Sequence, residues 1–191
     1  MKPEVSRDFN VPTPIVVEDR IFVVTENNGA RVSSIKQADL TKAADMTKPA
    51  DMAKPADMTD KNDFAFTLAL ESSSDLLSGD SHSPVRIGKW VAGIDRDFVI
   101  LDPLDGLMEI ARFEDKSLQG YVSLMVDGDR IWASTGDGTQ LLLRVSDGAT
   151  EELGRFRALD GPGAIFAHPA FCGGVLYVRG PTWLDAYSVS R

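Results

Sequence analysis

A repeat of about 42 residues is the feature that most constrains the fold of this 191-residue chain. Four segments combine a turn that contains Asp or Gly with a β-rich run: Glu18–Val24, Ile87–Ala92, Gly128–Ala133 and Gly173–Val178. Between Arg20, Lys89, Arg130 and Val175 the spacings are 69, 41 and 45 residues. The first interval contains a 26-residue low-complexity stretch, and subtracting it leaves 43 residues. Three intervals of similar length indicate a repeat architecture.

A second feature recurs in phase with the first. The apolar run Val99–Leu101 leads into an Asp-Gly turn at Gly106, and Leu141–Leu143 leads into a turn at Gly148, 42 residues later. Glycine accommodates the positive φ that such hairpin turns require. A further strand follows each turn, and two incomplete copies flank this pair. The strands that follow the turns are Leu107–Phe113 and Glu151–Phe156. The incomplete copies are Gly29–Ile35 and Trp183–Val189.

Each unit also begins with a short β-rich run. Three of these runs are Thr13–Val17, Tyr121–Val126 and His168–Phe171. Three to four short antiparallel strands every 40 to 45 residues are typical of β-propeller blades, and no convincing long amphipathic helix is evident. The sequence therefore predicts an all-β fold of about four antiparallel β-propeller-type blades. We expect a first blade-like unit in residues 1–35, an insert in 36–61 and the remaining units in 62–191.

The insert consists of four consecutive hexads in residues 36–59, each with the order Lys, variable, Ala, Asp, Leu or Met, and Thr or Ala. A period of six matches neither the helical period of 3.6 nor a heptad. Pro49 and Pro55 would also interrupt a helix. The composition predicts a disordered low-complexity loop. The alternative is a Met-bearing arm that contacts a partner.

The turn motif resembles the repeat of the PQQ-like β-propeller family. Leu101–Gly106 reads as an apolar strand, Asp, two variable residues, Asp and Gly, with Phe113 near the aromatic position that ends the next strand. The second copy departs from the motif, since Arg144 replaces the aspartate. The chain is also similar to bacterial propellers labelled as resembling the propeller subunit of the outer-membrane protein assembly machinery. The resemblance covers most of the chain outside residues 36–85 and implies about half of an eight-bladed ring.

The resemblance implies two classes of function. Some family members are quinoprotein dehydrogenases that hold PQQ and calcium, and others bind proteins. The dehydrogenases cover the cofactor with a disulfide between adjacent cysteines, which a chain with one cysteine, Cys172, cannot form. We therefore expect no PQQ or calcium, and no catalytic, cofactor-binding or metal-binding residues. A PQQ-dependent oxidoreductase, as a fragment or a relative, is the alternative, and a truncated propeller remnant without independent function is a third.

Individual polar residues favour structural roles. His82 and His168 are the only histidines, and neither has a metal-binding spacing. Pro169 biases His168 towards an extended conformation, so we expect it at the start of a strand and bonded to backbone. Six aspartates lie beside glycines or at strand ends, where Asp typically bonds its own turn: Asp102, Asp105, Asp127, Asp129, Asp137 and Asp147. The runs around Asp127 and Asp137 are too short for a twelve-residue calcium loop.

The remaining candidates are apolar. Trp90, Trp132 and Trp183 fall near strand positions of successive units, which predicts packing between blades. The alternative is an exposed aromatic surface for a peptide or glycan. We expect Cys172 to be a small buried residue.

Charge and hydropathy limit the partners. The formal net charge is −9, which argues against binding to nucleic acid or to anionic membranes. No apolar run is long enough to span a bilayer, and the first eight residues lack the apolar core of a signal peptide. The compartment is not determined, although the resembled relatives are typically exported to the cell envelope or periplasm.

These features together predict a non-catalytic binding or assembly scaffold with a protein or peptide partner. Recognition would use turns such as Asn27–Gly29 and Gly136–Gly138, or a free blade edge that accepts a partner strand. A homodimer that completes the ring is a further expectation, because about four units make half of an eight-bladed propeller.

Overall fold

Four antiparallel sheets make up the described part of the chain. The computed structural model describes residues 12–25, 28–37, 66–77, 83–158 and 165–189. Each sheet joins strands that follow one another in the chain, and we name the sheets blades 1 to 4. Blade 1 contains β1 (Ile15–Val17), β2 (Arg20–Thr25), β3 (Gly29–Gln37) and β4 (Phe66–Ser74). Blade 2 contains β5 (Val85–Ile87), β6 (Trp90–Asp95), β7 (Asp97–Asp102) and β8 (Met108–Phe113).

Blades 3 and 4 continue the pattern. Blade 3 contains β9 (Val122–Asp127), β10 (Arg130–Thr135), β11 (Thr139–Ser146) and β12 (Ala149–Arg157). Blade 4 contains β13 (Ala170–Cys172), β14 (Val175–Arg179) and β15 (Leu184–Ser188). A short 3-10 turn, η2 (Lys116–Leu118), links blades 2 and 3, and the Asp115 carboxylate caps it by accepting the Ser117 N–H. The predicted all-β fold of about four antiparallel, propeller-type blades is confirmed.

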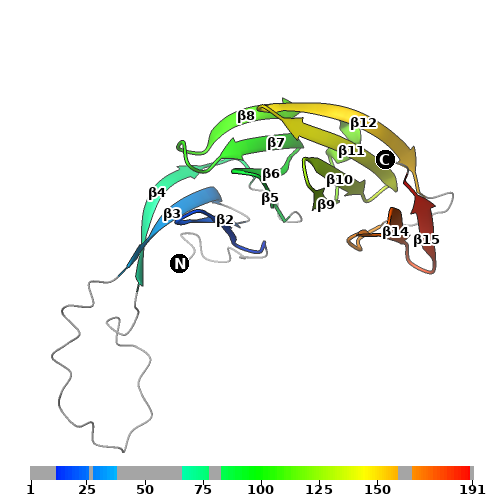
Figure 1. The fold of residues 1–191 in the computed structure, drawn as a ribbon, viewed down its shortest axis with the longest axis horizontal. Helices are drawn as coiled ribbons and strands as arrows, with labels where there is room; N and C mark the ends of the chain where they lie inside the picture. Colours follow the sequence, from blue (N-terminus) through cyan, green and yellow to red (C-terminus); the bar gives the residue numbers. More distant parts are fainter. Residues whose placement is uncertain (1–11, 26–27, 38–65, 78–82, 159–164, 190–191) are drawn as a thin grey trace, which may run out of the picture.

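The blades form an open arch in chain order (Figure 1). The fourth strands, β4, β8 and β12, follow its outer side, and the first strands lie towards its inner side. Neighbouring blades pack through β1 against β5, β5 against β9, and β8 against β12. A polar link joins blades 1 and 2, since the Arg86 guanidinium donates to the Val16 carbonyl oxygen at 2.9 Å.

Apolar side chains fill each gap between blades. Phe22, Val32 and Leu101 belong to the core between blades 1 and 2, and Phe98 and Leu143 belong to the core between blades 2 and 3. A third core lies between blades 3 and 4. Because both faces of blade 2 are covered, five of the six residues of β7 are buried rather than every second one. The arch therefore depends on contacts between blades as well as on hydrogen bonds within them.

The first blade extends across the insert. β3 continues to Gln37, past the unit boundary expected at residue 35, and pairs antiparallel with β4, which begins at Phe66. The fourth strand of blade 1 thus comes from sequence beyond the insert, because a strand pair needs only that its two ends meet. Apart from residues 36 and 37, the hexads lie outside the described residues. The predicted loop and the alternative Met-bearing arm both fall there.

The third and fourth strands carry the same irregularity in all three four-stranded blades. Their register shifts after Val32 in blade 1, after Ile100 in blade 2 and after Leu142 in blade 3, each the fourth residue of its strand. One residue of the fourth strand is left unpaired there, which is a β-bulge and increases the local twist. The repeat predicted from the sequence therefore extends to a detail of the backbone.

Candidate functional site

The predicted turn roles of two aspartates are confirmed. The Asp102 carboxylate accepts the Leu104 N–H at 2.9 Å in the turn between β7 and β8, and its carbonyl oxygen accepts the Leu107 N–H at 3.0 Å. The Asp137 carboxylate accepts the Thr139 N–H at 3.0 Å and the Thr135 hydroxyl. Burial raises the pKa of Asp137, but these hydrogen bonds outweigh it and hold the pKa below its ordinary value.

The glycines of the two Asp-Gly turns also behave as predicted. Gly106 has φ of 62° and Gly148 has φ of 74°. A Cβ atom on Gly148 would lie 2.8 Å from Ile110 Cγ2 of the neighbouring blade, so this turn also needs a small residue for packing.

The other polar candidates lie apart from one another. Asp105, Asp127, Asp129 and Asp147 are exposed at turns, and within the described ranges no three His, Cys, Asp or Glu side chains are placed to bind a metal ion. His168 is exposed and precedes β13 by two residues, as expected from its proline neighbour. The backbone hydrogen bond expected for its side chain is not found among the described residues. His82 lies outside them.

The expectation for Cys172 is wrong, because its side chain is exposed. Side chains alternate along a strand, and Phe171 packs towards blade 3, so Cys172 points to the other face of blade 4. Nothing in the described chain covers that face. The tryptophan prediction is confirmed: Trp90 packs on the core between blades 2 and 3, and Trp132 and Trp183 pack in the core between blades 3 and 4.

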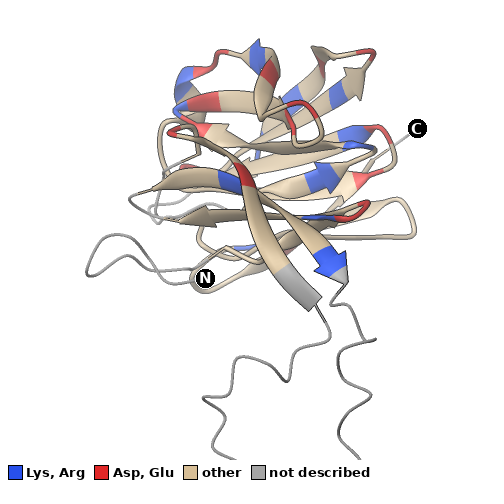
Figure 2. Cartoon of the chain, turned by 90° about the vertical axis from the view of Figure 1, so that its left-hand side faces the viewer, with Lys and Arg blue, Asp and Glu red and all other residues tan. Residues whose placement is uncertain are grey.

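The predicted recognition turns lie at the same end of their blades. Each connects a second strand to a third, in blade 1 for Asn28–Gly29 and in blade 3 for Gly136–Gly138. Asn27 is outside the described residues. Seen from the blade 1 end, Lys and Arg lie next to Asp and Glu over the fold rather than in a patch of one sign (Figure 2).

Blade 4 differs from the other blades at its outer edge. β15 pairs with β14 only, so the position that β4, β8 and β12 hold in the other blades is vacant within the described chain. The sequence had already shown Trp183–Val189 as a copy of the first half of a repeat. The free blade edge expected from the sequence corresponds to this position, whereas the cavity beside it was not predicted.

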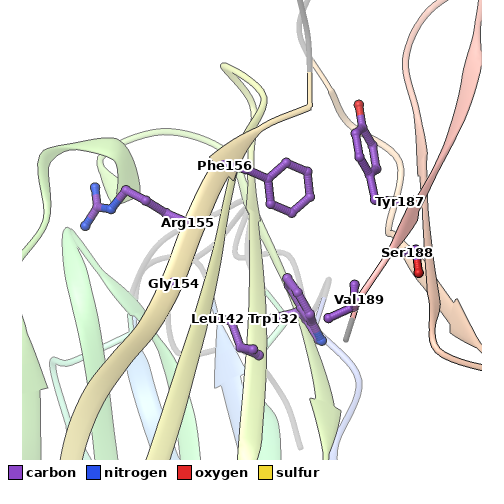
Figure 3. Close-up of a pocket in the computed structure, with 8 residues that line it drawn as sticks. All are labelled: Trp132, Leu142, Gly154, Arg155, Phe156, Tyr187, Ser188 and Val189. Atoms are coloured by element: carbon purple, nitrogen blue, oxygen red, sulfur yellow. The ribbon is translucent and has the colours of Figure 1, made fainter. Parts of the chain in front are cut away.

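A cavity of about 470 Å³ opens beside this edge, between β12 and β15 (Figure 3). Its lining is largely apolar: Trp132, Leu142, Gly154, Arg155, Phe156, Tyr187, Ser188 and Val189. The Phe156 and Tyr187 rings pack against each other at a tilt of 49°, with centroids 4.7 Å apart. The Tyr187 hydroxyl donates to the Ala158 carbonyl oxygen at 2.7 Å and lies 3.2 Å from the Asp185 carboxylate. A strand placed at this edge would cover the cavity.

The far face of blade 4 is exposed and mostly apolar. Register places Ala170, Tyr177 and Ala186 side by side across its three strands, and all three are exposed. Leu184, next along β15, is 65% exposed. Soluble domains rarely leave a contiguous apolar sheet face in water. The candidate functional site is therefore the end of blade 4, made up of its free edge, the cavity and this face.

Together these features define, for the described residues, a β-propeller-like arch of four blades, the last of which has three strands. Comparison with solved structures gives the same fold. The crystal structure of BamB from Moraxella catarrhalis matches with a TM-score of 0.51 and 14% sequence identity, over 93% of this chain and 42% of that one. The chain thus spans less than half of the matched protein. The likeness supports a β-propeller-like fold, and membership of the PQQ-like repeat family stays a prediction.

Comparison at the level of sequence gave no match. No family model matches the chain, and no curated protein does. In the described residues, no helix is long and apolar enough to cross a membrane.

Proposed function

We propose that this protein is a non-catalytic, propeller-type scaffold that binds a protein or peptide partner at the end of blade 4. The observation that carries the proposal is the fourth-strand position beside β15, which no described residue occupies, with its apolar cavity and the exposed apolar face next to it. An unpaired strand edge offers backbone donors and acceptors, and an adjacent pocket selects side chains, which is how strand addition recognises a partner.

The carboxylates that were weighed as cofactor or metal ligands support a structural role instead. Asp102 and Asp137 use their oxygens within their own turns. Cys172 lies at a strand end on the exposed face, and a single cysteine cannot form the disulfide that covers PQQ in the resembled dehydrogenases. We accordingly propose that the protein uses neither PQQ nor calcium.

Photocrosslinking in cells tests the binding role. A photoreactive phenylalanine analogue replaces Tyr177, which is 38% exposed on the apolar face of blade 4. The matched control carries the analogue at Glu114, an exposed residue after β8. The proposal expects discrete adducts of defined mass from Tyr177 and none from Glu114. Equal or absent crosslinking at both positions contradicts it.

A titration of PQQ with calcium into the purified protein tests the competing redox function. Trp132 lines the cavity, so its fluorescence reports binding there. The proposal expects no saturable change, whereas saturation at one quinone per chain would overturn the non-catalytic assignment.

A further inference from the structure

Asp185 departs from the repeat at the edge of blade 4. In blades 1 to 4 the fourth residue of the second strand pairs with Arg31, Val99, Leu141 and Asp185 of the third strand, respectively. Arg31 is 6% exposed and both Val99 and Leu141 are 0% exposed, whereas Asp185 is exposed. An exposed carboxylate therefore lies at a position that is buried in each of the other three blades.

The Asp185 carboxylate lies on the side of blade 4 that faces blade 3. Its partner Val178 belongs to the core between these blades, and directly opposed residues share one face of a sheet. The Tyr187 hydroxyl lies 3.2 Å from the carboxylate. Within the described ranges, no lysine or arginine forms an ion pair with Asp185. Arg155 at the cavity points away from Tyr187 (Figure 3), and its guanidinium binds Asp115 at 2.7 Å.

A partner strand that pairs with β15 would remove water from this carboxylate. Covering a charge costs free energy unless an opposite charge or hydrogen-bond donors compensate it. Side chains directly opposite one another on antiparallel strands have Cβ atoms about 4.5–5.5 Å apart, which is within reach of a lysine or arginine. The net charge of −9 also favours the approach of a basic partner. The complement of Asp185 is therefore a basic residue on the added strand.

Gly154 leaves room for a second side chain of the partner. It pairs with Leu142 and lines the cavity, and a Cβ atom placed on it would meet nothing within 4 Å. Blade 2 has Ala111 at the same position, packed on the core between blades 2 and 3. Tyr187 borders the cavity and lies two residues from Asp185 on the same face of β15 (Figure 3). A partner residue opposite Tyr187 would thus point towards this space, whose apolar lining favours an apolar side chain.

We propose that the partner recognised at blade 4 is an extended peptide segment that pairs antiparallel with β15, with a lysine or arginine opposite Asp185 and an apolar side chain opposite Tyr187. The fourth strands β4, β8 and β12 all pair antiparallel with the third strands, which sets the direction. The apolar residue then precedes the basic one by two positions, or by three if the segment has the bulge of those strands. The inference rests on the binding function proposed above and names the chemistry of the partner.

Selection from a displayed library of random short peptides on the immobilised full chain tests this recognition. The wild type should enrich peptides with an apolar residue two or three positions before a lysine or arginine. Asp185→Lys should instead enrich an acidic residue at the basic position, and Gly154→Val should select against large apolar side chains, because its own side chain fills the space. Two matched controls should enrich the wild-type motif: Glu114→Lys, at an exposed residue after β8, and Gly120→Val, at a glycine that also has nothing within 4 Å of a Cβ atom.

Fluorescence anisotropy with one labelled peptide from the wild-type selection measures the charge pair. Asp185→Asn should raise the Kd of this peptide at least about tenfold. Replacing the basic residue of the peptide by glutamine should weaken binding equally in the wild type and add little in Asp185→Asn, which is the signature of a direct pair. A scrambled peptide of the same composition should not bind. Far-UV circular dichroism of each variant should match the wild type, because Asp185 is exposed and the space above Gly154 is open.

The outcomes separate this inference from the binding function on which it rests. No enriched motif, a motif without a basic residue, or a motif that Asp185→Lys leaves unchanged would each overturn the inference. If discrete adducts still form at Tyr177 in the crosslinking experiment, the scaffold function stands and only the basic strand is refuted. If Tyr177 gives no adducts, the binding role at blade 4 is itself refuted.

Discussion

Two neighbouring leucines of β11 allow the packing between blades to be measured. Leu143 is 0% exposed and belongs to the core between blades 2 and 3, whereas Leu142 is half-buried and lines the cavity beside blade 4. Leu→Ala removes three carbon atoms, and each buried methylene contributes about 0.8 kcal/mol, or about 2.4 kcal/mol in all. At Leu143 the enclosed void adds a further penalty, for a total of about 3–4 kcal/mol. At Leu142 the neighbouring space is already open, so we expect about 1 kcal/mol.

Urea unfolding followed by far-UV circular dichroism measures the two costs. The two variants make the same chemical change one residue apart in one strand, so each serves as the control for the other. Equal losses of unfolding free energy would refute the reasoning, since they would mean that the two faces of blade 3 are packed equally well.

Three further outcomes follow from the structure. Gly148→Ala should lower the unfolding free energy by about 1 kcal/mol or more, because φ is 74° and the new Cβ would meet a neighbouring side chain, whereas Gly120→Ala, with nothing within 4 Å, should be close to neutral in the same urea assay. Hydrogen bonds from Arg155 lower the pKa of Glu152, so the stabilisation is complete above the ordinary glutamate pKa of about 4.3 and is lost as pH falls through the lower folded-state value. Glu152→Gln should therefore weaken the dependence of stability on pH in acid titrations, and an unchanged profile would contradict the ion pair. Cys172 should react with a thiol reagent in the folded protein nearly as fast as in urea, and strong protection would contradict its exposure.

The sequence predicted those parts of the fold that depend on local pattern. Strands such as β2 and β10 were identifiable because apolar runs follow a turn at a constant interval, and the turn at Gly148 because its φ demands glycine. The fourth strand of blade 1 was assigned to a separate region. Its partner β3 lies across the insert, and no local pattern records a pairing over such a distance.

Features that depend on which face is covered could not be predicted. Cys172 has apolar neighbours and looked buried, but burial in a blade requires a blade on each side, and the described chain places one only on the Phe171 side. The cavity likewise exists because no described strand fills the fourth position of blade 4. Its lining residues come from β10, β11, β12 and the segment at β15, and each would be an ordinary core residue if a fourth strand were present.

The connection between β3 and β4 has a consequence for protein engineering. Twenty-eight residues separate Gln37 from Phe66, where blade 2 needs only five between β7 and β8. The entropy of closing a loop grows only with the logarithm of its length, so the longer connection costs about 1.5 kcal/mol more. The nine-residue strands at its base hold the hairpin in register on both sides of the bulge. This hairpin is therefore a natural place to graft a reporter or a binding domain without cutting the arch.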